Sequence, residues 1–264
     1  MATIVITGGT DGLGRALALH YLDAGQTVVV VGRSRAKFEA LAAGAVAGTA
    51  HFVAADLTLV AENKRVVETV TRLVGAVDVL ILCAAYARWD RVETAEGFEH
   101  TFALYYLSRA LLVTGLRPGL VLNTSVPGAA RDAIPHDDLQ LREGFAFKTA
   151  NQLSRRANEL LGLHLAQGPG GTRHILYSPG FVRSSHAGSL GRFARLGVTV
   201  MAALLGTPPA KAAARAAALL ADPPAEPHSA FDRDRRVELG ASAEDVAEAE
   251  WLWTRTRSLT EPHG

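Results

Sequence analysis

The feature that most constrains the fold of this chain is the alternation of short apolar runs with segments that carry a helical pattern. This alternation predicts a parallel β-sheet wrapped by helices, because parallel strands need a crossover connection, which is usually a helix. Several of the runs are continuously apolar, which is typical of strands covered on both faces. The predicted strands are Thr3–Thr7, Thr27–Val31, Val77–Leu82, Leu120–Thr124 and Arg173–Tyr177.

Helical periodicity fills the intervals between these strands. The predicted helices are Leu13–Ala24, Arg35–Ala42, Ala61–Val74, Phe98–Leu112 and Phe147–Ala166. Two proline-rich pieces bracket an alanine-rich helix, Ala210–Ala221, and Ala241–Leu259 is predicted as a last surface helix. No linker divides the series, so we expect a single domain over residues 1–264 with a helical tail over about 241–259.

Composition excludes several classes of protein. The 27 Lys and Arg residues nearly balance the 26 Asp and Glu residues, which argues against a nucleic-acid or polybasic membrane binder. The single cysteine excludes a disulfide framework and fits a reducing compartment, and no histidines have metal-ligand spacing, so we expect no metal. No secretory signal is visible, and the most apolar later stretch, 196–205, is too short to span a membrane. We therefore expect a cytoplasmic protein.

A glycine-rich segment lies between the first predicted strand and the first predicted helix, Thr7-Gly8-Gly9-Thr10-Asp11-Gly12-Leu13-Gly14. Glycines at this place let the backbone turn tightly and approach a pyrophosphate, which the positive end of a helix attracts. The next strand ends about 20 residues later, where a ribose-reading residue belongs. A purely structural turn is the alternative interpretation, since ordinary turns use glycine as well.

At the ribose-reading position the chain has Val31-Gly32-Arg33-Ser34, with no acidic residue. A carboxylate there would bind a free 2′-hydroxyl, whereas a guanidinium accommodates a 2′-phosphate. Arg33 therefore favours NADP(H) over NAD(H) as the cofactor. A solvent-exposed arginine without a ligand is the other interpretation.

These motifs resemble the short-chain dehydrogenase/reductase family, and the similarity continues along nearly the whole chain. Thr7–Gly14 has the TGxxxGxG spacing of that family. The C-terminal segment from Ala243 to Trp253 and the long gap between Ser125 and Lys148 are similar to the branch of retinol dehydrogenases and protochlorophyllide reductases. The resemblance implies a Rossmann-like, doubly wound parallel sheet of seven strands in the order 3-2-1-4-5-6-7, with helices on both faces.

The resemblance also implies which residues bind the cofactor. Asp56 and Leu57 match the Asp-Leu pair after the third strand, whose aspartate meets the adenine, and Ser178–Ser184 resembles the Pro-Gly turn that closes over the nicotinamide. The cofactor-binding residues expected on this basis are Gly8, Thr10, Asp11, Gly12, Leu13, Gly14, Arg33, Asp56, Leu57, Ala84, Ala85, Lys148, Pro179, Gly180 and Val182.

The catalytic residues of the family carry over only in part. Ser125 matches the catalytic serine and Lys148 matches the lysine of the YxxxK motif, but the tyrosine position holds Gly144. Tyr105 replaces the asparagine that the family carries on a helix, and the Asn-Asn-Ala-Gly after the fourth strand is replaced by Leu82–Ala85. The expected catalytic residues are therefore Ser125 and Lys148, with Tyr105 as the substitute proton donor.

Other interpretations of these aromatic and basic residues stay open. Tyr105 and Tyr106 fit a packing role equally well, since tyrosine is often half-buried. Tyr86 and His136 are weaker candidates for the proton donor. The pair Arg155-Arg156 is expected on a solvated helix face.

The apolar segment over about 181–206 is expected to be a flap over a hydrophobic substrate, or else an ordinary buried helix. Members of the family often assemble through two long helices, here Phe98–Leu112 and Phe147–Ala166, which favours a homodimer.

Three functions follow from these expectations. The first is an NADP(H)-dependent oxidoreductase for a hydrophobic carbonyl, imine or conjugated substrate, with natural-product tailoring as one such role. The second is a non-redox enzyme on the same scaffold, such as a cyclase, isomerase or dehydratase. The third is a catalytically silent NADP(H)-binding protein.

Overall fold

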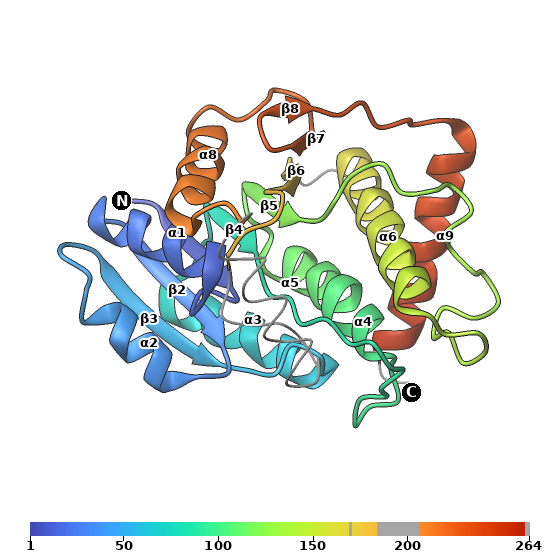
Figure 1. The fold of residues 1–264 in the computed structure, drawn as a ribbon, viewed down its shortest axis with the longest axis horizontal. Helices are drawn as coiled ribbons and strands as arrows, with labels where there is room; N and C mark the ends of the chain where they lie inside the picture. Colours follow the sequence, from blue (N-terminus) through green and yellow to red (C-terminus); the bar gives the residue numbers. More distant parts are fainter. Residues whose placement is uncertain (169–170, 184–205, 262–264) are drawn as a thin grey trace.

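The computed structural model describes residues 1–168, 171–183 and 206–261. Within them one eight-stranded sheet has the order β3-β2-β1-β4-β5-β6-β7-β8, and Figure 1 shows helices on both sides of it. Strands β1 to β7 are parallel and follow the predicted order, so the doubly wound α/β fold is confirmed. The prediction of seven strands is wrong, because the chain turns back after β7 and adds a short antiparallel strand, β8, at the edge.

The strands end close to their predicted positions. The parallel strands are β1 Thr3–Thr7, β2 Thr27–Gly32, β3 Thr49–Ala54, β4 Val79–Leu82, β5 Leu120–Thr124, β6 Arg173–Ser178 and β7 His228–Asp232, and β8 is Arg235–Arg236. A search for apolar runs does not find β3 and β7, because His51 and Ser229 interrupt their apolar character.

The helices also agree with the predicted series. The described helices are α1 Gly12–Asp23, α2 Arg35–Ala42, α3 Val60–Val74, α4 His100–Phe102, α5 Ser108–Leu116, α6 Phe147–Gln167, α8 Pro209–Ala221 and α9 Ala243–Thr260, with a π-helical turn, η1, over Ala103–Leu107. The predicted helix Phe98–Leu112 is thus built as α4, η1 and α5 in succession. The predicted tail over about 241–259 corresponds to α9, whose start is fixed by a capping box between Ser242 and Asp245.

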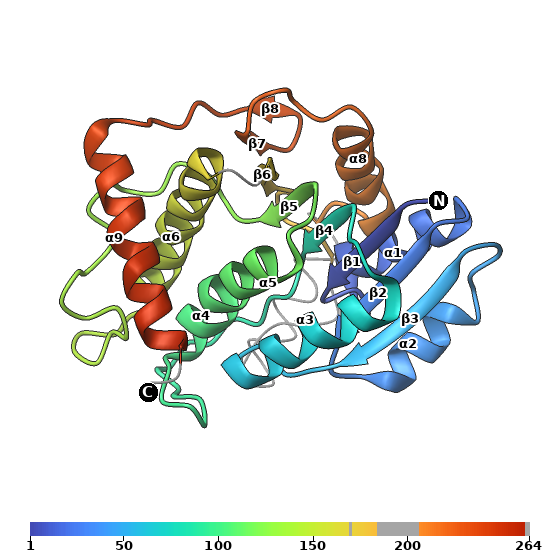
Figure 2. The same ribbon diagram turned by 180° about the vertical axis from the view of Figure 1, so that it is seen from behind.

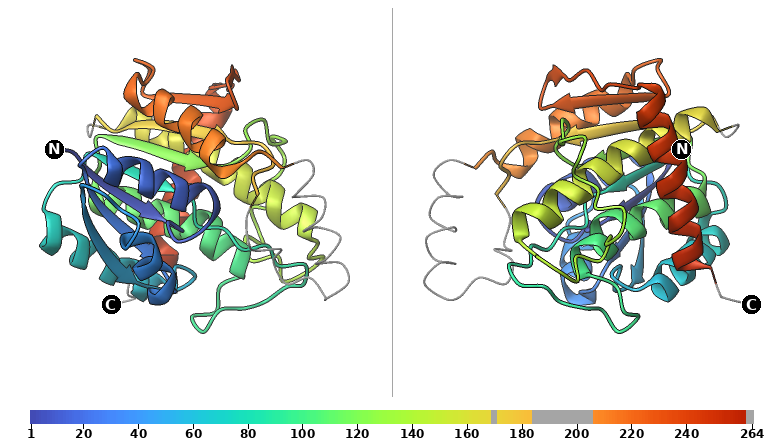
Figure 3. Two further views of the ribbon diagram at one scale, coloured as in Figure 1. Left: turned by 60° about the vertical axis from the view of Figure 1, so that its left-hand side comes forward. Right: turned by 90° about the vertical axis from the view of Figure 1, so that its right-hand side faces the viewer.

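Two helical layers cover the sheet. Helices α1, α2 and α8 pack on one face, over apolar side chains of β1, β2 and the middle strands. Helices α3, α5 and α6 cover the other face, and α9 packs along the outside of α6 (Figures 2 and 3). None of the described helices is long and apolar enough to cross a membrane.

The parallel strands all present their carboxyl ends at one edge of the sheet, and the loops there carry most of the predicted site residues. Most of the predicted flap, residues 184–205, lies outside the described residues. The two ends of that segment are joined, since Val182 pairs with Thr207 and Arg183 Nε donates to the Gly206 carbonyl at 2.9 Å.

Candidate functional site

The glycine-rich loop between β1 and α1 is held by close backbone packing. Gly8 has a φ of 66°, and a Cβ atom there would lie 2.8 Å from the Ala84 backbone. A Cβ atom on Gly14 would lie 2.5 Å from the Gly8 carbonyl oxygen. Both positions therefore require glycine, and the start of α1 lies directly against the loop.

The other residues of this loop serve the helix start and the core. Asp11 caps α1 by accepting a hydrogen bond from the Gly12 N–H at 2.7 Å, and its second oxygen lies 2.9 Å from Lys37 Nζ. The Leu13 side chain is buried in the core, so it has only its backbone to offer a ligand. Thr10 lies beside Gly32, at the end of β2. The first-turn N–H groups of α1 make this loop a place where a diphosphate fits.

Residues after β2 and β3 lie at the same edge of the sheet. Arg33 is exposed, and its guanidinium carbon lies 5.5 Å from the centre of the Tyr86 ring. Asp56 Oδ1 accepts hydrogen bonds from the N–H and the hydroxyl of Thr58, at 3.0 and 2.8 Å. Leu57 is buried in the core. Arg33 and Asp56 therefore lie just after the carboxyl ends of the neighbouring strands β2 and β3.

Ser125 directly follows β5, and the Pro-Gly turn follows β6. The Ser125 N–H donates to the Tyr177 carbonyl of β6 at 3.1 Å, so the two strand ends stay in register. Gly180 lies against the Arg233 guanidinium. On the other side, Ala84 donates its N–H to Thr7 Oγ1 at 3.3 Å, while Ala85 is exposed.

Lys148 lies in the first turn of α6 and is exposed. Because α6 begins at Phe147, Gly144 precedes the helix. Residue 144 therefore does not stand one helical turn before Lys148, and the Tyr–Lys pair of the YxxxK motif has no counterpart at these two positions.

A different cation of α6 contacts the loop that carries Ser125. Arg155 Nε donates to the Val126 carbonyl at 2.9 Å, and its Nη2 donates to the Pro127 carbonyl at 3.2 Å. Sequence reasoning did not assign Arg155 a role in the site. The only signal was its spacing of seven residues from Lys148, which places both on the same side of the helix.

The expectation of a solvated face for Arg155-Arg156 is wrong for the second residue. Arg156 is buried, and its Nη2 donates to Asp245 and Glu248 of α9, both at 2.6 Å. The reason is that α9 covers this side of α6, which the periodicity of α6 alone does not reveal.

Tyr105 lies in the π-helical turn η1, a feature that is frequent at functional sites. Asn158 Nδ2 donates to the Tyr105 carbonyl at 2.7 Å. The guanidinium carbon of Arg109 lies 5.4 Å from the centre of the Tyr105 ring. Burial raises the pKa of the Tyr105 phenol, while the Arg109 charge and a backbone hydrogen bond at Tyr86 act in the opposite direction. The turn thus holds a phenol beside a cation.

The remaining aromatic and histidine candidates are placed elsewhere. Tyr106 is fully buried, and its hydroxyl lies 2.8 Å from Thr256 Oγ1 of α9, in accord with a packing role. His136 packs at 4.4 Å against the Trp251 ring and lies 3.5 Å from Glu248, so it contacts α9 and not the strand ends.

Arg109 anchors a buried polar network that the sequence did not indicate. It is 3% exposed, and its Nη1 donates to Asn123 Oδ1 at 2.7 Å and to the Thr124 carbonyl at 2.8 Å. Asn123 in turn donates to Asn158 Oδ1 at 2.8 Å and contacts His174 Nε2 at 3.2 Å. Burial lowers the pKa of Arg109 to about 10. The network ties α5, β5 and α6 together behind Ser125.

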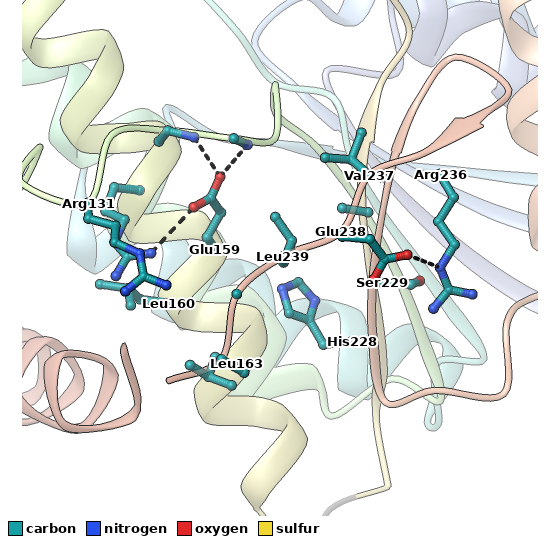
Figure 4. A pocket seen from close by; sticks show the side chains of 16 residues that line it. Arg131, Glu159, Leu160, Leu163, His228, Ser229, Arg236, Val237, Glu238 and Leu239 are labelled. Atoms are coloured by element: carbon teal, nitrogen blue, oxygen red, sulfur yellow. Dashed lines mark hydrogen bonds and ion pairs between the residues drawn. The ribbon is translucent and has the colours of Figure 1, made fainter. Parts of the chain in front are cut away.

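The network ends at a histidine pair beside a cavity. The Nδ1 atoms of His174 and His228 lie 3.2 Å apart. His228, Glu159 and Leu163 are among the residues that line a cavity of about 220 Å³ (Figure 4). A larger groove, of about 610 Å³, runs between α1 and α8. Neither space is lined by Ser125, Lys148 or Tyr105, and in the described ranges no His, Cys, Asp or Glu side chains gather as three or more metal ligands would.

Comparison with known proteins fits this geometry. Residues 2–126 match the family described as short chain dehydrogenase. These residues belong to the short-chain dehydrogenase family. A Streptomyces sp. (strain C5) protein named as a daunorubicin C-13 ketoreductase, DnrU, is 30% identical over 191 residues, which cover 69% of this chain and 66% of the relative. The next two curated relatives are matched over 37% and 25% of their lengths, so the chain matches less than two thirds of each of these relatives.

Solved structures extend the likeness in fold beyond residue 126. The crystal structure of an uncharacterized protein from Mycobacterium paratuberculosis aligns with 98% of this chain and 93% of its own, with a TM-score of 0.72 at 25% identity. A short-chain dehydrogenase from Burkholderia cenocepacia, solved in complex with NADP, aligns with 88% of this chain and 96% of its own, with a TM-score of 0.66 at 20% identity. The short-chain dehydrogenase fold thus covers almost the whole chain.

Proposed function

We propose that this protein is an NADP(H)-dependent oxidoreductase that transfers a hydride between the nicotinamide and a hydrophobic carbonyl, imine or conjugated substrate. The observation that carries the proposal is Arg33, which is exposed at the carboxyl end of β2 with no acidic residue beside it in the sequence. A guanidinium there suits a 2′-phosphate. The family match and the oxidoreductase names of the relatives support the reaction class, and the NADP complex of the Burkholderia protein supports the cofactor.

The described residues fit a bound dinucleotide. Gly8 and Gly14 leave no room for side chains between the loop and the start of α1, and Arg33 and Asp56 flank the place of the adenosine. When bound, NADP(H) supplies the hydride. The protein holds the cofactor, orients the substrate and moves the proton.

The proposed proton donor is Tyr105. Donation of its proton leaves a phenolate, which the positive charge of Arg109 beside the ring stabilises. The family resemblance gives Ser125 the role of polarising the substrate oxygen. It gives Lys148 the role of the cation that holds the nicotinamide ribose. The contacts of Arg155 with the Ser125 loop favour Arg155 in that role instead.

A second candidate is an NADP(H)-binding protein without hydride transfer. It is favoured by the absence of a phenol at position 144, where a glycine precedes α6, and by the exposed position of Lys148. A non-redox enzyme on the same scaffold is favoured by the same departures, since both readings need the cofactor site but not the tyrosine.

Substrate, assembly and location remain proposals. A tailoring role in natural-product formation is supported by the name of the Streptomyces relative. A homodimer through α5 and α6 would have to use surface that α9 leaves open, since α9 already packs on α6. The single-domain organisation and the cytoplasmic location stay predictions.

The test is oxidation of NADPH, followed by its absorbance, with a panel of aromatic ketones, quinones and cyclic imines. Tyr105→Phe should lower turnover by roughly 10²- to 10⁴-fold, the usual share of a positioned general acid, without weakening NADPH binding. Ser125→Ala should also lower turnover, and Tyr21→Phe, on α1, is the matched control.

Comparison of Lys148→Met with Arg155→Met decides which cation acts, because only the acting one should reduce turnover. Unchanged turnover in both the Tyr105 and the Ser125 variants would reject this site. Tight NADPH binding without turnover on any substrate would favour the silent protein, and conversion without net oxidation would favour the non-redox enzyme.

A further inference from the structure

A second arginine lies near Arg33, at the edge of the sheet where the parallel strands end. Arg88 follows β4, and its guanidinium carbon lies 5.1 Å from the centre of the Tyr86 ring. The guanidinium carbon of Arg33, which follows β2, lies 5.5 Å from the same ring centre. Two guanidinium groups from loops at the carboxyl edge thus converge on one aromatic side chain.

These two charges have little compensation within the described residues. Neither arginine forms an ion pair there, and Arg88 Nε is buried without a hydrogen-bond partner. The acid whose charge acts on this cluster is Asp56, and one of its oxygens is already engaged with Thr58. A group of like charges held together in this way attracts an anion.

The neighbouring histidine, His100, provides no negative charge, because an imidazole side chain is either neutral or positive. His100 is 8% exposed, its Nδ1 has no hydrogen-bond partner, and its ring centre lies 6.1 Å from that of Tyr86. Burial, and then the charges of Arg88 and Arg33, lower the pKa of His100, while Asp56 opposes them. The two arginine charges thus disfavour a proton on His100, as expected where both act on the same small volume.

We infer that Arg88 and Tyr86 act together with Arg33 as the recognition site for the 2′-phosphoadenosine end of NADP(H). This inference rests on the proposed function and assigns the phosphate to residues outside the glycine loop. A phosphomonoester carries close to two negative charges and three acceptor oxygens, which two guanidinium forks match. The Tyr86 ring gives the guanidinium groups a flat face to lie on.

The experiment measures binding of two nucleotides to the full chain by titration calorimetry. 2′,5′-ADP carries the 2′-phosphate, and 5′-AMP lacks it. Arg88→Ala and Arg33→Ala should each weaken 2′,5′-ADP binding by about 10- to 100-fold, the effect of one charge-assisted hydrogen bond, and leave 5′-AMP binding within about 3-fold. Each should also flatten the salt dependence of 2′,5′-ADP binding, since fewer phosphate charges are neutralised.

Two further variants keep the test decisive. Arg35→Ala is the matched control, because that guanidinium lies 5.3 Å from the centre of the Phe52 ring and not over Tyr86, and both affinities should stay unchanged. Arg88→Lys keeps the charge without the fork, so it should retain part of the 2′,5′-ADP affinity if Arg88→Ala misfolds.

The outcomes separate this inference from the function it rests on. Loss of 2′,5′-ADP affinity in the Arg33 variant but not in the Arg88 variant would overturn the inference and leave the proposed cofactor intact. Equal loss for both nucleotides in the Arg88 variant would assign it a structural role and also overturn the inference. If the unaltered protein binds neither nucleotide, the proposed function fails first.

Discussion

The chain places an arginine beside a tyrosine at two different depths. At the edge of the sheet, Arg33 and Arg88 lie over Tyr86, within reach of solvent and without ion-pair partners in the described part of the chain. Inside the fold, Arg109 lies over Tyr105. The buried guanidinium donates two hydrogen bonds to neutral acceptors through Nη1, although its Nη2 has no partner. Among the described residues, no acceptor holds the two guanidinium groups at the edge.

The difference distinguishes a charge held within the fold from the two charges that we propose to bind a ligand. Arg109 is held by Asn123 and the β5 backbone, so its removal would leave buried acceptors unsatisfied. The free energy of unfolding should therefore depend on Arg109 and nucleotide affinity on Arg88. The buried charge also acts on Tyr105, because it opposes the rise that burial causes in the pKa of that phenol.

The largest expected effect comes from Arg109→Met compared with Arg88→Met. Loss of the buried hydrogen bonds should lower the free energy of unfolding by about 2–4 kcal/mol, whereas the Arg88 variant should stay within about 1 kcal/mol of the parent. Urea denaturation followed by circular dichroism measures both. Equal losses in the two variants would mean that the depth of the arginine does not decide its role.

A smaller loss is expected where the buried network meets α6. A Cβ atom on Gly162 would lie 2.3 Å from His228 Cε1 and 2.7 Å from His174 Nδ1. Gly162→Ala should therefore lower the free energy of unfolding by about 1–3 kcal/mol through overpacking. Gly168→Ala is the control, because the nearest atom to its Cβ would be 3.6 Å away. Thermal unfolding that shifts equally in both variants would contradict this packing argument.

The smallest expected effect is a dependence of stability on pH. Burial lowers the pKa of both His174 and His228, and the charges of His228 and Arg109 lower that of His174 further. The unfolded chain, with histidine pKa values near about 6.5, then binds more protons than the folded chain. The free energy of unfolding should therefore fall as the pH drops below about 6.5 towards the folded values.

Denaturation midpoints between pH 5 and pH 8 measure this slope. His228→Gln should make this slope shallower. His100 also has a lowered pKa, so His100→Gln measures how much of the slope comes from the histidine at the sheet edge. An identical slope in the unaltered protein and in both variants would show that these histidines do not cause the pH dependence of stability.

Prediction from sequence succeeded where a local pattern carries the information. The apolar runs predicted five of the parallel strands, and the tail helix begins near its expected start, at the capping residues Ser242 and Asp245. The strand order came from the family resemblance and agrees with the sheet. It was wrong about Arg156 and silent about Arg155, because both depend on contacts made by other elements. The candidate catalytic positions remain predictions. The close packing at Gly8 and Gly14 explains why the chain has glycine at these two positions of the loop.

The sequence by itself determined the parallel sheet with its covering helices, the glycine loop and the basic residue after the second strand, since periodicity and backbone freedom act over a few residues. Only the tertiary structure decided which polar side chains meet. Asn123, Asn158, His174 and Arg109 come from four separate elements and form one buried network, and Arg33 and Arg88 meet over Tyr86. Such encounters follow from the register of parallel strands and from the helix that covers each face, which no short segment of the chain encodes.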